Sequence, residues 1–419
     1  MKKLVILLFI SFNYIAKSQI ATIFADDFVD SSKISIGIIG GYNLNSNALT
    51  NSFMTKFYTG GYINSDLKNS VLSRMQNLNR VGGNYYSGVY GAFKLDSLCH
   101  SKNMSLFFSV RDRVHVDAQF SQDLFTVALY GNARYAGKTA NFNDFSLNLM
   151  RYQQLQIGLF SSKLDSAARW GIGISFLKGS QYLSVAAPTA ELYTSEDGQY
   201  IDFNTNMSVS KAGSVNNGLG TMNGYGTSID VYFEAPFQTR VGDSKLRASV
   251  SDLGFIRFFK QEAVLKQDSL FHYTGFTINN IYGLQNSSLG NIPKDSVVSA
   301  IAPFKKKAFS VTLPAVLDLT FETHFNKHFY LIEGIKNVFN ANYTLLYYVK
   351  SNIYINSKLM VSATFGYGGY GTLNYGLSIA AKMGKGMTIY LGSNNIEGYI
   401  SPSTTLGQGV YFSLVKNFK

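Results

Sequence analysis

Apolar and polar side chains alternate along this chain with a period of two, from about residue 32 to its last residues. Residues 201–210, with the sequence IDFNTNMSVS, carry mostly apolar side chains at odd positions and polar side chains at every even position. Such a strand offers one face to hydrocarbon and the other to water, as every strand of a transmembrane barrel must. The pattern predicts an all-β fold, an antiparallel transmembrane barrel of about 14 strands (roughly 12–16), each near the length that a tilted crossing needs.

The alternation also assigns a face to individual residues. In residues 228–235, for example, apolar Val231 and Phe233 oppose Asp230 and Glu234, and a strand is likewise expected over residues 123–135. Carboxylates that recur on one face are costly in lipid, so this face is expected to line water or to pair with cations across the lumen. The candidate lumen-facing residues are Arg134, Asp202, Asp230, Glu234, Asp318, Glu322 and Lys382. The residues predicted to face lipid include Phe125, Val127, Leu129, Ile229, Val231, Phe233, Leu317 and Phe321.

Only residues 64–78 have a convincing helical pattern, with Leu67, Val71 and Met75 on one stripe. This helix is expected to pack against the barrel, and plugging the lumen or lying on the membrane surface are the alternatives. The weakly patterned residues 259–306 read as an elaborated loop, whereas 325–327, 356–357 and 384–386 read as tight turns. The last alternating segment, residues 409–419, is predicted to close the barrel against the first strand, because an open edge is not tolerated in lipid.

Composition and the first residues indicate export to a membrane. Residues 1–18 read as a signal peptide, with Lys2 and Lys3 before an apolar core and a small-x-small cleavage site at 16–18. Residues 19–419 are predicted to form a single barrel domain, since no linker divides them. Aromatic residues make up 15% of the chain, as the aromatic girdles of a barrel require, and mean hydropathy is only +0.02. The net charge is +12, but the basic residues are scattered along the chain rather than grouped into a stripe. This distribution disfavours nucleic-acid binding and favours pairing of the basic residues with anionic lipid at the rims.

The motifs that carry chemistry are few, and each has a plainer structural explanation. Residues 366–371 match G-x-G-x-x-G, but an alternating strand follows instead of the helix that a dinucleotide site needs, so a hairpin is preferred. His324 and His328 flank a turn near Glu322 without a third convergent metal ligand, and Cys99 stands alone. The sequence therefore assigns no catalytic residue, no cofactor and no metal site.

Four Asp-Ser-apolar triplets fall in predicted loops or turns. They resemble the short O-glycosylation acceptor of exported Bacteroidota proteins, and ordinary Asp-Ser turn chemistry is the equally weighted alternative. The candidate glycosylation residues are Ser97, Ser166, Ser269 and Ser296.

Several short motifs together resemble a known family. These are residues 105–113 (SLFFSVRDR), 123–124 (DL), 130–132 (YGN), 251–256 (SDLGFI) and the ending from 389 through 395. From about residue 64 onward they are similar to an uncharacterised family of Bacteroidota outer-membrane barrels, distantly similar in turn to the FadL-type and PorP/SprF-type proteins. The resemblance implies no catalytic residues, because none is assigned in that family.

Two functional classes follow from the resemblance, and neither is enzymatic. The first is a selective or occluded conduit for small solutes, hydrophobic ones included, in the outer membrane of a Gram-negative bacterium. The alternative is a scaffold barrel of an envelope machine such as type IX secretion or gliding, and a barrel lipase is a distant third. The implied partners are outer-membrane lipid, the barrel-assembly machinery during biogenesis and, for a scaffold, secretion or gliding components, with no nucleic acid.

Overall fold

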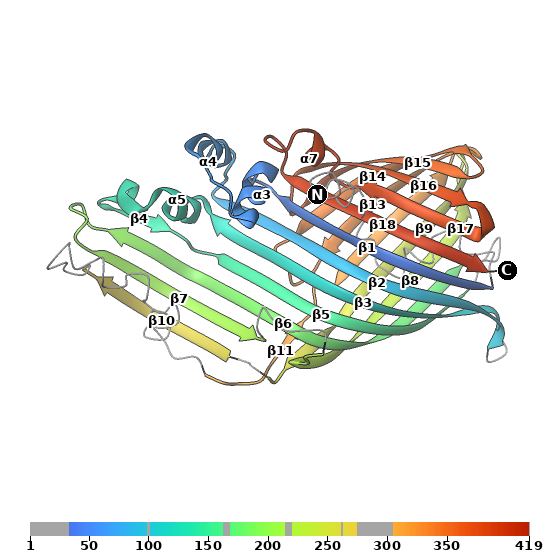
Figure 1. Ribbon diagram of the computed structural model, residues 1–419, viewed down its shortest axis with the longest axis horizontal. Helices are drawn as coiled ribbons and strands as arrows, with labels where there is room; N and C mark the ends of the chain where they lie inside the picture. Colours follow the sequence, from blue (N-terminus) through green and yellow to red (C-terminus); the bar gives the residue numbers. More distant parts are fainter. Residues whose placement is uncertain are drawn as a thin grey trace, which may run out of the picture.

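The alternating segments form antiparallel strands that close on themselves into a barrel (Figure 1). The computed structural model describes residues 33–98, 101–161, 168–213, 220–260, 263–274 and 305–418. Going round the wall, the 14 strands are β1 (Ile34–Ser46), β2 (Leu78–Leu98), β3 (Ser101–Ser121), β5 (Phe145–Ser161), β6 (Arg169–Thr194), β8 (Gly224–Gln238), β9 (Asp243–Phe258), β12 (Val316–His324), β13 (Phe329–Val338), β14 (Thr344–Asn356), β15 (Leu359–Gly369), β16 (Leu373–Met383), β17 (Met387–Ser393) and β18 (Gly407–Phe418). The predicted fold class and strand number are confirmed.

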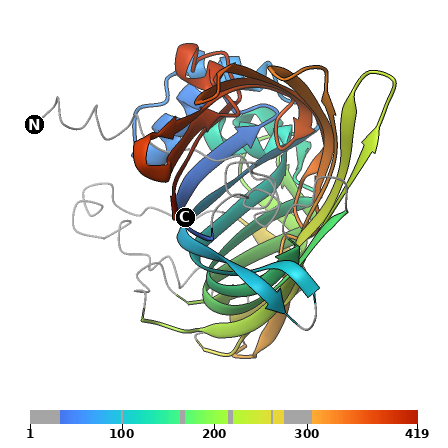
Figure 2. The ribbon, with the colours of Figure 1, turned by 90° about the vertical axis from the view of Figure 1, so that its right-hand side faces the viewer.

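The barrel closes where the sequence predicts. Strand β18 pairs with β1 in a register that runs from Ile34 opposite Phe418 to Asn45 opposite Gly407. The N-terminal end of β1 and the C-terminal end of β18 therefore meet at one end of the barrel, which faces the viewer in Figure 2. No strand edge is left open between them, as a wall in hydrocarbon requires.

The two faces of the wall differ as the alternation predicts. In β8, Ile229, Val231 and Phe233 are exposed on the outside, whereas Asp230 and Glu234 are buried inside. A band of exposed apolar side chains surrounds the barrel, as a lipid-facing surface requires. It includes Ile36, Ile38, Val89, Val110, Leu155, Ile157, Ile172, Ile174, Leu253, Phe255, Val349, Ile353, Phe365, Leu377, Ile379 and Leu391.

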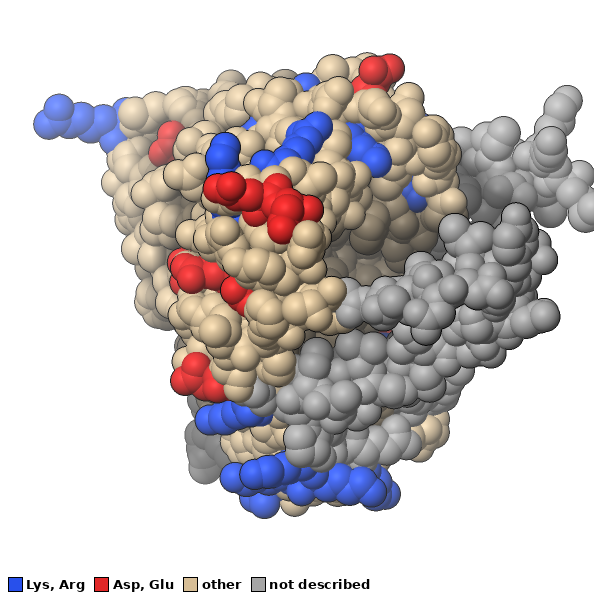
Figure 3. Space-filling view, turned by 90° about the vertical axis from the view of Figure 1, so that its left-hand side faces the viewer, with Lys and Arg blue, Asp and Glu red and all other residues tan. Residues whose placement is uncertain are grey.

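The two ends of the barrel are unlike each other. One end, here the helical end, carries α3 (Asn51–Thr59), α4 (Ser65–Leu72), α5 (Gln122–Tyr130), the 3-10 turn η1 (Asn132–Tyr135) and α7 (Glu397–Ile400) (Figure 1). The other, here the turn end, has tight connections at residues 239–242, 325–328, 357–358 and 384–386. Basic and acidic side chains both lie on the face at the helical end (Figure 3). None of the helices in the described part of the chain is long and apolar enough to cross a membrane.

One predicted strand is wrong, because residues 123–135 form α5 and η1 instead. Ser121 caps α5, its hydroxyl accepting a hydrogen bond from the backbone of Leu124 at 3.1 Å. Phe125 consequently packs with Phe53, Val71 and Phe120 rather than facing lipid. The apolar residues of this short segment fit both a strand and a helix, and the capping serine is the signal that the pattern alone missed.

The other predicted non-strand elements are partly right. The helix expected over residues 64–78 is α4, which is shorter and packs through Val71 against α3 and α5, away from the lumen. The loop expected over residues 259–306 contains β10 (Ala263–Tyr273), and residues 275–304 lie outside the described part. Residues 1–32, which include the predicted signal peptide, and Cys99 also lie outside it.

A sheet extends beyond the barrel at the helical end (Figure 1). The first half of β6 pairs with β8 in the wall, and its second half pairs with β7 (Ile201–Ala212), which in turn pairs with β10. One short strand, β4 (Lys138–Asn141), completes this sheet by pairing with the last residues of β6. A second short strand, β11 (Phe309–Thr312), belongs to the wall instead, where it pairs with the last residues of β9.

Candidate functional site

The lumen of the barrel is the candidate site, and side chains fill much of it. Inward-facing Arg111, Gln154 and Asp230 are each only 1% exposed, and Phe107 is fully buried. The inward side chains of a water-filled pore would instead be wet. The inward-facing residues that the structure describes therefore form a packed interior over much of the barrel.

An apolar cluster crosses the interior. It is called the lumen core here and consists of Ile39, Tyr86, Tyr90, Ala92, Phe107, Phe160, Tyr232 and Val415. These residues come from β1, β2, β3, β5, β8 and β18, so the cluster joins wall strands that are far apart in the sequence. Period-two alternation puts each of them inside, and only the closed barrel brings them into contact.

A charge cluster lies near the turn end. Arg247 of β9 is bonded to two carboxylates, with Nε 2.5 Å from Oε2 of Glu234 and Nη1 2.7 Å from Oε2 of Glu322. Arg169 lies 3.5 Å from Glu234, and Lys245 lies 3.6 Å from Glu322. Oppositely charged side chains on neighbouring wall strands thus neutralise one another inside the barrel, which lowers the cost of burying them.

A second charge cluster lies at mid-height. Arg113 Nη1 is 2.5 Å from Asp252 Oδ1, and Arg111 donates to Gln156, whose own amide donates to Asp230 at 2.7 Å. A β-bulge in the pairing of β8 with β9 places Asp252 at φ +60°, and its backbone N–H donates to Asp230 at 2.7 Å. Bulges commonly re-aim a side chain in this way.

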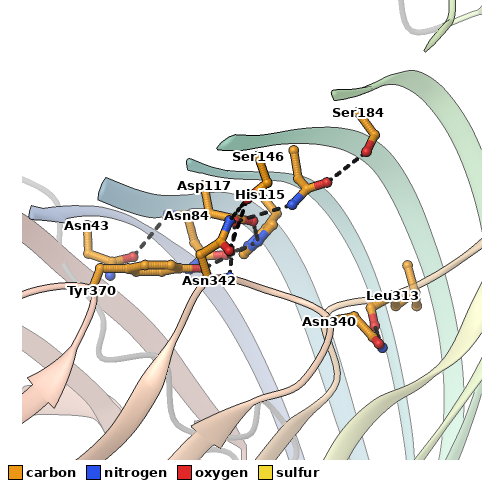
Figure 4. A network of polar contacts seen from close by, with 11 residues as sticks. Asn43, Asn84, His115, Asp117, Ser146, Ser184, Leu313, Asn340, Asn342 and Tyr370 are labelled. Carbon is orange, nitrogen blue, oxygen red and sulfur yellow. Dashed lines mark hydrogen bonds and ion pairs between the residues drawn. The ribbon is translucent and has the colours of Figure 1, made fainter. Parts of the chain in front are cut away.

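A third network joins the wall to a connection that folds inward at the helical end (Figure 4). Asp117 is 1% exposed and accepts hydrogen bonds from the backbone N–H of Asn342 at 3.1 Å and from the amide of Asn148 at 3.3 Å. His115 lies between Asp117, at 2.9 Å from Nε2, and Asn84, at 2.8 Å from Nδ1. Residues 339–343, between β13 and β14, are thereby tied to β3 across the lumen.

A chamber of about 150 Å³ lies between the mid-height charge cluster and the helical end. Strands β1–β3 form one side of it, and strands β12–β16 with residues 339–343 form the other. The side chains around it are rich in Tyr and Asn, and they include Asn43, Asn45, Asn84, Asn374, Asn394, Asn395, Tyr85, Tyr86, Tyr152, Tyr343, Tyr348 and Tyr370. No residue of α4 lines the chamber, and among the described residues the side chains packed beneath it belong to the wall strands.

The predicted lumen-facing residues fall into two groups. Asp230, Glu234, Asp318 and Glu322 are buried on the inner face. Asp318 accepts a hydrogen bond from the Tyr348 hydroxyl at 2.9 Å and lies opposite Lys336 in the ladder.

Of the other three, Asp202 and Arg134 lie outside the lumen, and Lys382 continues the inward register of β16 at its exposed end, opposite buried Thr388. Asp202 is on β7, beyond the barrel, and contacts His272 of β10 at 2.5 Å. Arg134 is on η1, where its guanidinium lies 3.9 Å from the centre of the Tyr130 ring. Lys382 lies exposed near the turn end of β16.

The remaining candidates are placed as follows. Residues 366–371 form the end of β15 and the turn into β16, as the hairpin interpretation expects. His324 stacks on Tyr330 and bonds Glu322 at 2.6 Å, and within the described residues no three His, Cys, Asp or Glu side chains come together as a metal site. Ser97 and Ser269 lie in β2 and β10 rather than in loops, because their backbones join ladders, and Ser166 and Ser296 lie outside the described residues.

Sequence reasoning missed most of the basic and polar residues of the lumen. Arg111, Arg113, His115 and Asp117 occupy every second position of β3, so their spacing alone places them on one face. Asp252 gave no such signal, because its orientation depends on the bulge.

The chain is similar to several solved structures. The Ralstonia pickettii toluene transporter TbuX is 9% identical in sequence, with a TM-score of 0.46 over 94% of this chain and 91% of that one. A Pseudomonas aeruginosa FadL homologue is 9% identical, with a TM-score of 0.42 over 93% and 91%. The translocator domain of the autotransporter NalP from Neisseria meningitidis is 7% identical, with a TM-score of 0.36 over 96% and 94%.

No curated protein matches the chain. One family model does, over residues 28–394, and so begins well before the motifs quoted above. Its description is "Family of unknown function (DUF5723)". Because the match spans most of the chain, the protein belongs to this family of unknown function.

Proposed function

We propose that the protein is a non-enzymatic outer-membrane barrel that acts as an occluded, selective conduit for small solutes, exported by the signal peptide at residues 1–18. The observation that carries this proposal is the filled interior: the lumen core and the two charge clusters lie across the path between the chamber and the turn end. A solute that enters the chamber passes further only if these side chains move. Free diffusion of unrelated solutes is therefore excluded in this state.

The exposed apolar band supports the membrane location, and the unequal ends support an orientation. Outer-membrane barrels keep long connections outside the cell and short turns in the periplasm. The helical end accordingly faces outward and the turn end faces the periplasm. The chamber, which lies toward the helical end, then opens to solutes arriving from outside.

Conductance in planar bilayers tests the occlusion. Wild-type protein is expected to show no large, weakly selective conductance. The variant Phe107→Ala/Tyr232→Ala removes two aromatic side chains of the lumen core and is expected to conduct. The matched control Phe108→Ala/Phe233→Ala removes the outward-facing neighbours and should leave the lumen closed. Large conductance by the wild type would overturn the proposal, and heat-modifiable mobility in gels confirms that each variant is folded.

A scaffold barrel is the second candidate, favoured by an exposed aromatic group at the helical end. Phe57, Tyr58 and Tyr62 are 70%, 91% and 84% exposed on α3 and the segment after it. Exposed aromatic side chains are common anchors of protein interfaces. Photo-crosslinking from position 58 in native membranes tests this role: specific adducts with secretion or gliding components support it, and only lipid adducts contradict it.

A further inference from the structure

Basic side chains gather where the barrel wall meets the extension. Lys and Arg side chains lie along the lower edge of the helical end in Figure 3, which is the side of β10 and β11 in Figure 1. Lys260 follows β9, and Lys305, Lys306 and Lys307 precede β11; these four residues are here called the lysine junction. All four are exposed, and within the described part of the chain none of them forms an ion pair. The junction is therefore a surface of positive charge without acidic partners among the described residues.

Neighbouring strands hold both ends of the lysine run. The backbone N–H of Lys305 donates to the carbonyl of Val264 on β10 at 2.9 Å, and the Val264 N–H donates to the Lys305 carbonyl at 2.9 Å. Shortly after the run, Phe309 begins β11 opposite Phe258 of β9. The run thus crosses from the extension to the wall, and these contacts keep its charges where the two meet.

Two of the lysines line one open pocket on this surface. Lys260 and Lys306 lie on it together with Met222, Asn223 and Phe259. The backbone N–H groups of Phe259 and Lys260 donate to the carbonyl of Asn223 at 3.0 and 3.1 Å, so the chain is fixed beside the pocket. Lysine ammonium groups commonly bind phosphate, and Met222 and Phe259 give the same pocket an apolar part. The pocket therefore fits a ligand that has both a phosphate and an apolar portion.

The lysine junction borders the lipid-facing band. On the outer face of the wall, Lys178 of β6 lies opposite Tyr225 of β8, which lies opposite Arg257 of β9. Such a row marks the level of lipid head groups, because Tyr and basic side chains favour the membrane–water interface. The rows nearer mid-membrane are mostly apolar, with Phe176 and Phe255 first and then Ile174, Ile229 and Leu253. Lys260 follows Arg257 in the chain toward the helical end, so the junction lies beside the head groups.

We infer that the lysine junction binds the phosphorylated head group of a membrane lipid in the leaflet at the helical end. The acyl chains of that lipid lie against the apolar rows beside Arg257, which a soluble polyanion would not contact. A lipid bound here contacts both the wall and the start of the extension, so it ties the extension to the membrane surface. The inference goes beyond the proposed function, because it holds whether or not the lumen conducts.

Native mass spectrometry of the purified full-length barrel, titrated in detergent micelles, tests the inference. The probes are lipid A, which is a phosphorylated lipid of Gram-negative outer membranes, the same lipid without its phosphates, and inorganic phosphate. Lipid A is expected to bind saturably and more tightly than its dephosphorylated form, and added salt should weaken this binding because it screens exposed charges. Equal affinity for the two lipids would overturn the inference. Displacement of lipid A by an equal concentration of inorganic phosphate would indicate a site for free anions and would also overturn it.

Paired variants place the site. Lys260→Gln/Lys306→Gln removes the two pocket lysines and should lower the affinity for lipid A about fivefold for each lysine, or roughly 25-fold together. The matched control Lys56→Gln/Lys138→Gln removes the same charge from exposed positions on α3 and β4 and should bind as the wild type does.

Heat-modifiable mobility in gels shows whether each variant is folded, and Lys305→Gln/Lys307→Gln takes the place of the pocket variant if that one fails to fold. A loss of affinity in the junction variant alone supports the inference. Equal losses in the junction variant and the control would show an effect of net charge only and would overturn it, as would unchanged affinity in the folded junction variant.

Discussion

Arg247 is the residue whose loss should destabilise the barrel most clearly. It is 7% exposed, and it bonds Glu234 and Glu322, which are 2% and 3% exposed. Arg247→Met therefore leaves two buried carboxylates without their shared cation. Arg169 at 3.5 Å and Lys245 at 3.6 Å are more distant partners and replace it only in part.

The expected magnitude follows from this burial. Removing one partner of a buried ion pair typically costs about 3–5 kcal/mol, because the remaining charge stays buried. Replacing the whole group with neutral residues of similar volume is often close to neutral in stability. The triple variant Arg247→Met/Glu234→Gln/Glu322→Gln should thus recover most of the stability that the single variant loses.

Urea unfolding in lipid vesicles measures the difference, with the fluorescence of Trp170 as the reporter. Trp170 is the only tryptophan of the chain and lies on the outer face of β6. Arg257→Met provides the control on the same strand, because Arg257 is exposed and such changes usually stay within about 0.5 kcal/mol. If Arg247→Met unfolds within about 1 kcal/mol of the wild type, the cluster is hydrated and the filled-lumen reasoning is wrong.

Three further predictions concern other parts of the barrel. Val231→Arg puts a charge on the lipid face and should lower the free energy of unfolding by about 2–4 kcal/mol if the site lies near mid-membrane. Val241→Arg, in an exposed turn, is the control and should change it little. Equal folding yields of the two variants in vesicles would contradict the assignment of Val231 to the lipid face. Asn342→Ala removes the side-chain amide that donates a hydrogen bond to Asp117, so amide hydrogen exchange of residues 339–343 should become faster. Unchanged protection would show that this network does not hold residues 339–343 in place. Burial raises the pKa of Glu397 on α7 above its ordinary value, so its carboxylate form is less stable in the folded barrel than in the unfolded chain. The resulting loss of folding free energy is present above the folded pKa and absent below the unfolded pKa. Glu397→Gln should therefore be more stable than the wild type at neutral pH and equal to it well below the ordinary glutamate pKa. A difference in stability that does not change with pH would argue against this.

The sequence was informative where one residue's position depends only on its near neighbours. Period-two spacing alone places Val231 outside and Asp230 inside, and it places the segment around Leu414 beside β1 once closure is required. The same spacing failed at Phe125, where a nine-residue segment has too few turns to distinguish a helix from a strand.

Other features depended on contacts between distant strands. Alternation puts Tyr232 inside the barrel, but only the approach of Phe107 and Tyr90 from other strands makes its surroundings dry. Asp202 alternates as a wall residue does, yet β7 leaves the wall and continues in the extension. The chamber likewise depends on residues 339–343 folding inward, which their own sequence does not indicate.

Strand β6 joins the two halves of the molecule through one unbroken backbone. Its 26 residues run from Arg169, beside Glu234 in the turn-end charge cluster, to Thr194 in the extension. At about 3.3 Å per residue, such a strand spans roughly 85 Å. A pull on the tip of the extension therefore loads the hydrogen bonds between β6 and its wall neighbours in shear, many at once, rather than opening them one by one. Force applied to the extension is in this sense shared along the ladders that β6 makes with β5 and β8, before it reaches the ion pairs at the far end of the strand.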